Sequence, residues 1–203
     1  EDKNMGQYFD QFLSMDLDNK TENDPPSRGA TTQVSVIDRE GNAASITTTN
    51  GEGCGYLIPE LGIMLNNMLG EEDLNPSGFH NFVKQMRLPT MMAPSLILGR
   101  AGPELALGSG GSNRIRSAII QVILNYLTKG MNLKESVEAP RIHLEGSTLH
   151  FEPFAPIPNK IFLPEYIQFH KWDNQNLFFG GVNAVTLTEA VGDSRRGGAG
   201  CIY

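Results

Sequence analysis

The chain has 203 residues, 39% of them apolar and 19% charged, and its 16 basic and 23 acidic side chains give a formal net charge of −7. This length is enough for one domain with its own core, and no apolar run approaches the ~18 residues of a membrane-spanning helix. The acidic balance, without a lysine or arginine cluster, argues against binding nucleic acid through phosphates. Cys54 and Cys201 can form at most one bridge, which excludes a disulfide scaffold.

The N-terminal region is the most acidic part of the chain. Residues 19–29 are almost free of apolar side chains and contain two prolines and a glycine. Such a segment cannot bury enough surface to offset its ordering entropy, so we expect an exposed linker. Because the chain begins with Glu1 and shows no signal peptide, we expect it to be a piece of a longer protein and leave its compartment open.

Two β-hairpins are predicted in the first half of the chain. Residues 32–38 alternate between polar and apolar side chains, and a turn-forming segment separates them from the β-rich run at 43–49. A second hairpin is predicted from residues 95–99 and 104–108, around a turn that contains glycine and proline.

A long amphipathic helix is predicted at residues 113–129, where apolar side chains recur at helical spacing, and Gly130 is a suitable residue to end it. A short helix is expected at 133–138, followed by strands at 148–152 and 182–187. Strands, then a long helix, then further strands favour a layered α+β sandwich over repeated βαβ units.

Thr31 is a candidate nucleophile because of its place in the chain. A threonine hydroxyl needs a base within reach, and the α-amine of an N-terminal threonine, with a pKa of about 7.7–8, can serve as that base. Thr31 lies where the predicted linker meets the first strand, a suitable place for a cut. From position alone a strand-forming threonine is the favoured interpretation, since β-branched residues favour strands.

Other segments allow both a functional and a structural interpretation. The glycine-rich residues 108–113, between a strand and a helix, fit either an oxyanion or anion site or a tight turn, and they lack the spacing of a nucleotide-binding loop. The acidic run at 66–73 fits a clamp for a substrate amine, a hard-cation site or a solvated loop, without EF-hand spacing. Four histidines show no metal-ligand spacing: His80, His143, His150 and His170.

Six blocks of the sequence together carry a family resemblance: residues 31–38 with 41–43 and 47–49, then 62–67, 92–94, 108–115, 139–143 and 193–197. In this order they resemble the γ-glutamyltranspeptidase family of N-terminal-nucleophile hydrolases. Ordered agreement of six blocks does not arise by chance, so the resemblance is specific.

The resemblance implies an α+β fold, the C-terminal half of the αββα sandwich of N-terminal-nucleophile hydrolases. It divides the chain into residues 1–30, the tail of the large-subunit half with the linker to a cleavage site, and residues 31–203, a small-subunit-like catalytic region. The large-subunit half of the same precursor is the expected partner, and a small γ-glutamyl compound is the expected substrate. No cofactor or metal is implied.

The resemblance also assigns roles to single residues. The precursor is expected to cut itself between Ala30 and Thr31, and Thr31 then attacks a γ-glutamyl amide. An uncut chain is expected to be inactive because Thr31 then lacks a free amine. The other expected site residues are Thr49, which hydrogen-bonds the nucleophile, Gly111 and Ser112 at the oxyanion position, and Glu71, Thr90 and Asn67, which bind substrate.

Four positions depart from the family pattern. Gln33 replaces the usual histidine, Met68 a glutamine and Met91 a serine, and Asn50 can replace the asparagine expected after Thr49 only after a shift. The acylation machinery is therefore kept while the glutamate pocket is altered. This leaves open the same chemistry on another amide, such as a poly-γ-glutamate or an acylase substrate, or an unprocessed relative that serves as a structural or binding subunit.

Overall fold

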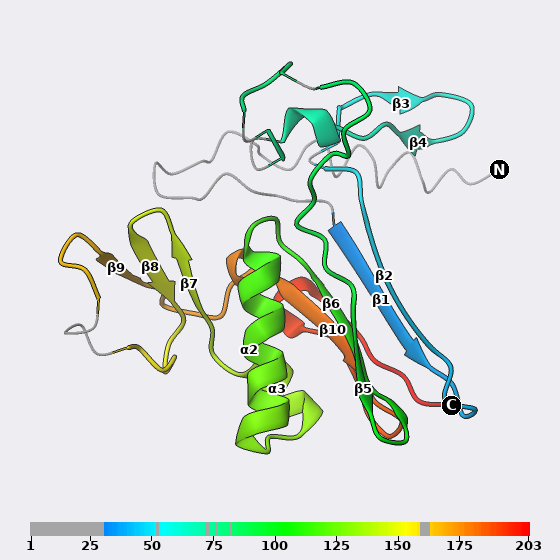
Figure 1. The fold of residues 1–203 in the computed structure, drawn as a ribbon, viewed down its shortest axis with the longest axis vertical. Coiled ribbons are helices and arrows are strands. Elements are labelled where there is room, and N and C mark those ends of the chain that lie inside the picture. Colours follow the sequence, from blue (N-terminus) through cyan, green and yellow to red (C-terminus); the bar gives the residue numbers. More distant parts are fainter. Residues whose placement is uncertain (1–30, 52, 72–73, 76, 82, 159–162) are drawn as a thin grey trace, which may run out of the picture.

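The computed structural model describes residues 31–51, 53–71, 74–75, 77–81, 83–158 and 163–203. The predicted linker and Ala30 lie outside these residues. The described part contains a β-hairpin, a four-stranded sheet and a helical layer stacked in that order, with a separate three-stranded sheet beyond the helices (Figure 1). Among the described residues, no helix has the length and apolar character needed to cross a membrane.

The first hairpin consists of β1 (Thr31–Ile37) and β2 (Ala43–Thr49), which pair antiparallel along their whole length. In the turn, the Asp38 carboxylate accepts hydrogen bonds from the Asn42 side chain (2.7 Å) and backbone N–H (2.8 Å). These hydrogen bonds lower the pKa of the Asp38 carboxyl. The predicted hairpin is confirmed, with its first strand beginning one residue earlier.

The central sheet is antiparallel, in the order β11-β10-β6-β5. The predicted second hairpin is β5 (Ser95–Gly99) and β6 (Gly102–Gly110), whose second strand is longer than expected at both ends. The strand expected at 182–187 is β10 (Gly181–Val185), and β11 (Ala190–Val191) was not predicted.

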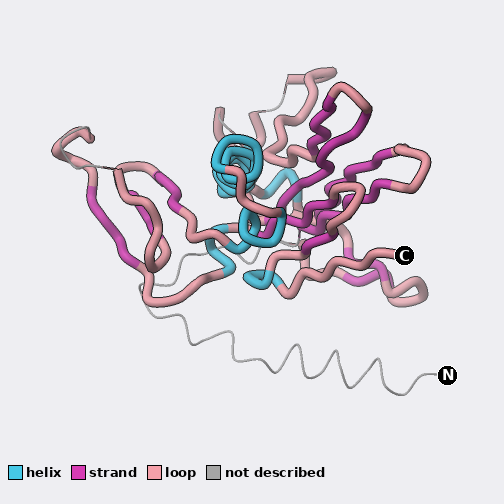
Figure 2. The backbone as a smooth tube through the Cα atoms, turned by 90° about the horizontal axis from the view of Figure 1, so that it is seen from below, coloured by secondary structure: helices cyan, strands magenta, loops and turns pink. Residues whose placement is uncertain are grey.

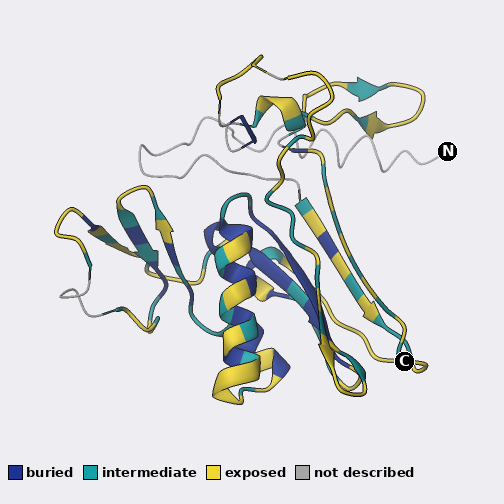
Figure 3. Ribbon diagram, in the orientation of Figure 1, coloured by how far each residue is buried: buried dark blue, intermediate teal, exposed yellow. Residues whose placement is uncertain are grey.

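Two helices cover one face of this sheet: α2 (Arg114–Lys129) and α3 (Leu133–Glu138), both as predicted to within a residue. Gly130 ends α2 in the left-handed conformation (φ 67°), which glycine adopts without strain. Figure 3 shows that burial is concentrated on β6, β10 and the sheet-facing side of α2. The core consists of Leu105, Leu107, Ile115, Ala118, Ile119, Val122, Leu133, Val137, Val182 and Ala184.

The three-stranded sheet lies on the opposite side of α2 from the central sheet, as Figure 2 shows in a view along that helix. It consists of β7 (Ile142–Glu145), β8 (Thr148–Phe151) and β9 (Gln168–Lys171), with β8 and β9 parallel. Only β8 was predicted. The remaining short elements are β3 (Leu57–Ile58), β4 (Ile63–Met64), and the 3₁₀ turns η1 (Met68–Gly70), η4 (Leu177–Phe179) and η5 (Ser194–Arg196).

Candidate active site

Two threonines face each other at the open end of the first hairpin. Thr31, the first residue of β1, pairs in register with Thr49, the last residue of β2. The Thr31 hydroxyl donates to Thr49 Oγ1 at 3.0 Å. Thr49 Oγ1 also accepts from the Gly51 backbone N–H at 3.0 Å. The structure thus brings together the residues that the resemblance named as nucleophile and partner.

Glycines of β6 form the surface on which this end of the hairpin rests. A Cβ atom at Gly110 would lie 2.6 Å from the Thr31 carbonyl oxygen, and a Cβ at Gly108 would overlap Gln33 Oε1. At Gly110 the overlap is with backbone, so this glycine is needed for the close approach of β1, whereas at Gly108 the absent side chain leaves room for the end of the Gln33 side chain. The glycine-rich segment therefore serves packing as well as the turn that follows it.

Gly111 and Ser112 form that turn, directly after the glycine beneath Thr31. Gly111 has φ +132°, and a Cβ on it would lie 2.7 Å from the Gly180 Cα atom. Ser112 adopts a left-handed conformation (φ 52°), which is uncommon for a residue other than glycine. Their carbonyl oxygens accept from the N–H groups of Arg114 (3.0 Å) and Ile115 (3.1 Å), so the turn leads straight into α2.

Glu71 and Asn67 approach the residues that follow β2. A Cβ atom at Gly51 would lie 2.7 Å from Glu71 Oε1, so the carboxylate sits against the residue whose N–H binds Thr49. The Asn67 backbone N–H donates to the Asn50 carbonyl at 2.8 Å. The loop therefore brings Glu71 to the same end of the hairpin as the two threonines.

Thr90 is not brought into this group. Its side chain is exposed, and its hydroxyl oxygen accepts from the Met92 N–H at 3.1 Å. Within the part of the chain that the structure describes, no hydrogen bond joins Thr90 to Thr31 or Thr49. The neighbouring Met91 is half-buried against the core.

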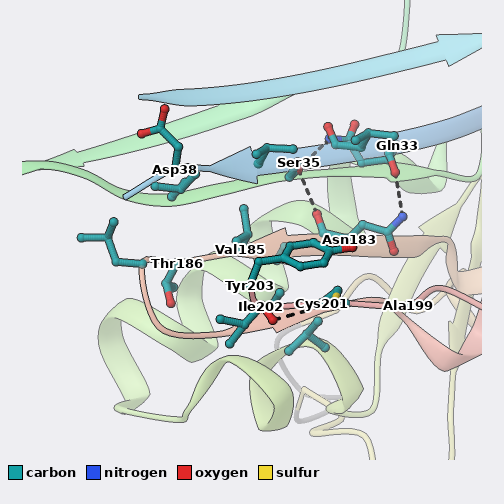
Figure 4. A pocket seen from close by; sticks show the side chains of 18 of the residues that line it. Gln33, Ser35, Asp38, Asn183, Val185, Thr186, Ala199, Cys201, Ile202 and Tyr203 are labelled. Carbon is teal, nitrogen blue, oxygen red and sulfur yellow. Dashed lines mark hydrogen bonds between the residues drawn. The ribbon is translucent and has the colours of Figure 1, made fainter. Parts of the chain in front are cut away.

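Gln33, which the sequence marked only as a departure from the family, is among the most enclosed polar side chains of the hairpin, with 4% of its surface exposed. Figure 4 shows it on β1 beside Ser35, with both residues facing Asn183 of β10. The Asn183 side-chain amide donates to the backbone carbonyl oxygen of Gln33 at 2.8 Å. Its spacing of two residues from Thr31, on the same face of a strand, was the available sequence signal.

A groove of about 530 Å³ lies between β1, β10, β11 and residues 199–203, and Gln33, Ser35 and Asn183 are among the residues that line it (Figure 4). At its end, Arg39 Nη2 donates to the Tyr203 carbonyl oxygen at 2.8 Å. Neither Thr31 nor Thr49 lines this groove, so it is separate from the threonine pair. The cysteine within it, Cys201, is free and exposed, as is Cys54.

Four buried charged side chains form a cluster behind the glycine turn, three of them from the blocks at 139–143 and 193–197 and the fourth, Glu152, from outside the blocks. Arg141 binds Asp193 (2.6 Å), and Arg195 binds both Glu152 (2.6 Å) and Asp193 (3.2 Å). Burial lowers the pKa of Arg141, against the opposing charge of Asp193. Burial also acts to lower the pKa of Arg195, but hydrogen bonding and the charges of Glu152 and Asp193 outweigh it and raise that pKa.

Three of the four histidines, which look scattered in the sequence, gather around one aromatic side chain. His143 and His150 contact the Phe178 ring, and His170 contacts His150 (ring centroids 5.1 Å apart). Burial lowers the pKa of His143 to about 4. Among the described residues, no group of three or more His, Cys, Asp or Glu side chains is placed to hold a metal ion.

The protein-family model for γ-glutamyltranspeptidase matches residues 5–203. The chain belongs to the γ-glutamyltranspeptidase family. It is 32% identical over 180 residues to the glutathione hydrolase proenzyme of Bacillus subtilis strain 168, and 34% identical over 173 residues to the acylase ACY 1 proenzyme of Pseudomonas sp. strain SE83. Each match covers 84% of this chain and 30% of the relative, so the chain spans about a third of the length of these relatives.

Solved structures of this family share the fold of the chain. A γ-glutamyltranspeptidase from Pseudomonas nitroreducens, solved in complex with L-DON, superposes with a TM-score of 0.68 at 24% identity, covering 85% of this chain and 99% of that one. The family fold is the αββα sandwich of N-terminal-nucleophile hydrolases, and the layers described here are part of it. The fold expected from the sequence is confirmed.

Proposed function

We propose that this chain carries the nucleophile of a γ-glutamyltransferase or hydrolase, and that the precursor is cut before Thr31 to release it. The hydrogen bond between Thr31 and Thr49 carries the proposal. It fixes one hydroxyl at the end of a strand, next to a turn that leads into the N-terminus of α2. A held hydroxyl beside backbone N–H groups at a helix start suits acyl transfer.

The proposed reaction has two steps. The α-amine of a free Thr31 takes the proton from Thr31 Oγ1 while that oxygen attacks the γ-carbonyl carbon. The C–N bond breaks, the leaving amine receives the proton, and a γ-glutamyl ester remains on Thr31. Water or an acceptor amine then attacks the ester carbonyl carbon and loses a proton to the α-amine. The bond between that carbon and Thr31 Oγ1 breaks, the α-amine returns the proton to Oγ1, and glutamate or a new γ-glutamyl amide is released. Backbone N–H groups of the Gly111–Ser112 turn would stabilise the oxyanion, each contributing about 3 kcal/mol.

Substrate binding in this proposal uses the loop that contains Asn67 and Glu71 and approaches the residues after β2. The Glu71 carboxylate, which lies against Gly51, would hold the α-amine of the γ-glutamyl group, with Asn67 in the same loop. Thr90, exposed and not joined to the threonines, would contact the α-carboxylate only if the loop around it closes on bound substrate. Its role therefore rests on the family resemblance.

We further propose that residues 31–203 act as the small-subunit-like region and that the rest of the precursor covers them. The outward face of the hairpin supports this, because Val34, Val36 and Ile46 each expose more than half of their surface. A sheet in a four-layer sandwich has both faces covered. The length of the relatives, about three times the matched segment, fits a partner half in the same precursor.

The same chemistry on another amide is the second candidate. The relative named an acylase proenzyme favours it, together with Met68 and Met91, which replace polar residues of the family's glutamate pocket. Hydrolysis rates for γ-glutamyl anilides and for acyl amides without an α-amino group would separate the two candidates.

The test is a comparison of Thr31→Ala with Thr32→Ala in the full-length protein. We expect the wild type to yield a chain that begins at Thr31, as read by intact mass and N-terminal sequencing. Thr31→Ala should stay uncut and lose more than about 1,000-fold in hydrolysis of a γ-glutamyl anilide, because one hydroxyl serves both steps. Thr32, whose side chain lies on the opposite face of β1 from Thr31, is the matched control and should keep both rates within about threefold.

Turnover by a pure Thr31→Ala protein would refute the assignment of the nucleophile. A wild-type protein that remains joined through Ala30 and Thr31 would instead favour the non-catalytic relative, in which the chain serves as a structural or binding subunit.

A further inference from the structure

The inward face of the β1–β2 hairpin is polar, although it packs on the central sheet. Side chains on this face come in cross-strand pairs: Thr31 with Thr49, Gln33 with Thr47, and Ser35 with Ser45. Only the pair next to the turn, Ile37 with Ala43, is apolar on this face, whereas Val34, Val36 and Ile46 point outward. This is the reverse of the usual arrangement, in which the covered face of a sheet is apolar. The covered face must therefore be held by hydrogen bonds.

Gln33 is the centre of this polar layer. Its Nε2 atom donates to Ser35 Oγ (2.8 Å) and Ser45 Oγ (2.9 Å), and its Oε1 atom accepts from the Thr47 hydroxyl. Nε2 also lies 2.9 Å from the Val34 carbonyl oxygen. A carboxamide offers two donor hydrogens and an acceptor in one plane, so the three acceptors around Nε2 share two hydrogens while Oε1 serves Thr47. One side chain thus joins both strands of the hairpin.

The same residue fixes the hairpin to the sheet beneath it. Gly108 of β6 leaves the space that Gln33 Oε1 occupies. The Asn183 side-chain amide of β10 donates to the backbone carbonyl oxygen of residue 33 at 2.8 Å, a contact that does not depend on the side chain at this position. Ser45, a partner of Gln33, donates its own hydroxyl hydrogen to the Leu107 carbonyl oxygen at 2.8 Å. Position 33 is therefore tied to both central strands, β6 and β10.

We propose that Gln33 is a positioning residue for the Thr31 nucleophile, setting the height and register of β1 above the glycine turn. The inference rests on the proposed function. Successive residues of a strand are only ~3.3 Å apart, so a shift of the backbone at position 33 carries Thr31 with it. A misplacement of about 1 Å at a reacting group can cost about 100-fold in rate.

A titratable side chain at position 33 would make the hydrogen bonds of this polar layer depend on pH. Around it, the hydrogen-bonding residues from β1, β2 and β10 (Ser35, Ser45, Thr47 and Asn183) carry no ionisable group. The nearby Asp193 contacts Asn183 only through its backbone N–H, which donates to Asn183 Oδ1 at 3.3 Å. Its carboxylate points elsewhere and is bound by Arg141 and Arg195. A carboxamide keeps the same donors and acceptor at every pH. An imidazole would lose its acceptor on protonation.

The first test compares Gln33→Leu with Gln121→Leu in the full-length protein. Gln121 is a matched control because its side-chain amide also bridges elements, binding the Ile142 backbone of β7 through both of its ends, on the far side of α2. We expect Gln33→Leu to lower kcat and the rate of self-cleavage by about 100-fold, with KM within about threefold. Gln121→Leu should change all three by less than about threefold.

The second test uses the pH profile of Gln33→His. A neutral imidazole keeps one donor and one acceptor and should restore much of kcat near pH 8. Once protonated it has donors only, so kcat should fall below about pH 6, a loss that the wild type does not show at the same pH. A merely structural role of position 33 would change the melting temperature without adding this limb to the kcat profile of folded enzyme.

The outcomes are distinct. If Gln33→Leu keeps kcat within about threefold of Gln121→Leu, the positioning role is refuted. If Gln33→Leu does not fold, the pH profile of Gln33→His decides, and a profile identical in shape to the wild type refutes the role. A wild-type protein that neither cuts itself nor hydrolyses γ-glutamyl anilide refutes the proposed function itself, whatever the variants do.

Discussion

At the scale of single residues, the turn after β6 combines two unusual backbone conformations for different reasons. Gly111 needs its conformation and also its missing side chain, since Gly180 fills the space. Ser112 has a left-handed conformation that a glycine would adopt with less strain. The turn therefore keeps its geometry at Ser112 even though this residue makes the local backbone less stable than a glycine would.

Substitutions at these two residues should therefore have opposite signs. Ser112→Gly should stabilise the protein by up to about 1 kcal/mol, because it removes the left-handed strain. Gly111→Ala should destabilise it by about 3 kcal/mol or more, through conformation and overlap together. Urea unfolding of the full-length protein measures both changes.

The turn glycine Gly146 separates the two costs at Gly111. It also has a positive φ (56°), but a Cβ atom there would meet nothing within 4 Å. Gly146→Ala should cost only about 1 kcal/mol. Equal losses for Gly146→Ala and Gly111→Ala would show that the contact with Gly180 is not tight in solution.

At the scale of secondary-structure elements, His143 is one of the contacts that hold β7 against α2. Its Nδ1 atom lies 2.8 Å from Ser117 Oγ. Its Nε2 atom is buried and has no hydrogen-bond partner among the described residues. Protonation would therefore place a charge and an unpaired donor inside the contact, and burial holds the pKa of His143 down to about 4.

This gives the stability of the protein a pH dependence with a definite sign. Between about pH 6.5 and 4 the unfolded chain binds a proton at His143 that the folded chain does not, so stability falls as the pH falls through that window. The loss should total roughly 1–3 kcal/mol and level off below about pH 4. Urea unfolding at several pH values measures it. His143→Gln should remove this part of the slope, and His80→Gln, in an exposed loop, should leave it unchanged.

Elements defined by local patterns were predicted well from the sequence. The first hairpin and α2 have their alternation, periodicity and end signals within a short stretch of chain. The strands β7 and β9 have only four residues each, and β9 pairs in parallel with β8 across an intervening segment. Such pairing depends on contacts distant in sequence, which no local pattern records.

The candidate site, too, was only partly predictable from the sequence. Position alone did not distinguish Thr31 from any strand threonine, and its pairing with Thr49 followed from the family resemblance. The setting of Gln33 could not be read from the sequence, because its backbone partner Asn183 is 150 residues away. Its other requirement, an empty place above Gly108, becomes visible only once β1 and β6 are stacked.

At the scale of the whole molecule, the buried charge cluster connects elements from distant parts of the chain. Arg141 donates to the Phe179 carbonyl oxygen (3.1 Å) just before β10, and Arg195 donates to the Ala139 carbonyl oxygen (2.9 Å) after α3. Glu152 accepts from the Arg141 backbone N–H at 2.9 Å. The cluster thus joins α3, the end of β8 and the start of β10, close to the glycine turn.

Removing one member should destabilise the molecule strongly, because its partners stay buried with uncompensated charge. Arg141→Met should lower the free energy of unfolding by about 3–5 kcal/mol. Arg39→Met, which removes an exposed guanidinium that donates to the Tyr203 carbonyl oxygen, is the control and should cost less than about 1 kcal/mol. Thermal unfolding of the full-length protein compares them; similar melting temperatures would mean that the buried charges are dispensable.

The pairing of Thr31 with Thr49 has a consequence for the proposed cut. Thr31 is the first residue of β1, in register with Thr49 and resting on Gly110. The residue that would become the new N-terminus is thus already anchored by the sheet while the chain is whole. Cleavage would change connectivity without requiring the hairpin to refold, and the freed amine would emerge beside the hydroxyl it must activate. The proposed cleavage would therefore remove only the covalent link before Thr31 from a hairpin that is already folded.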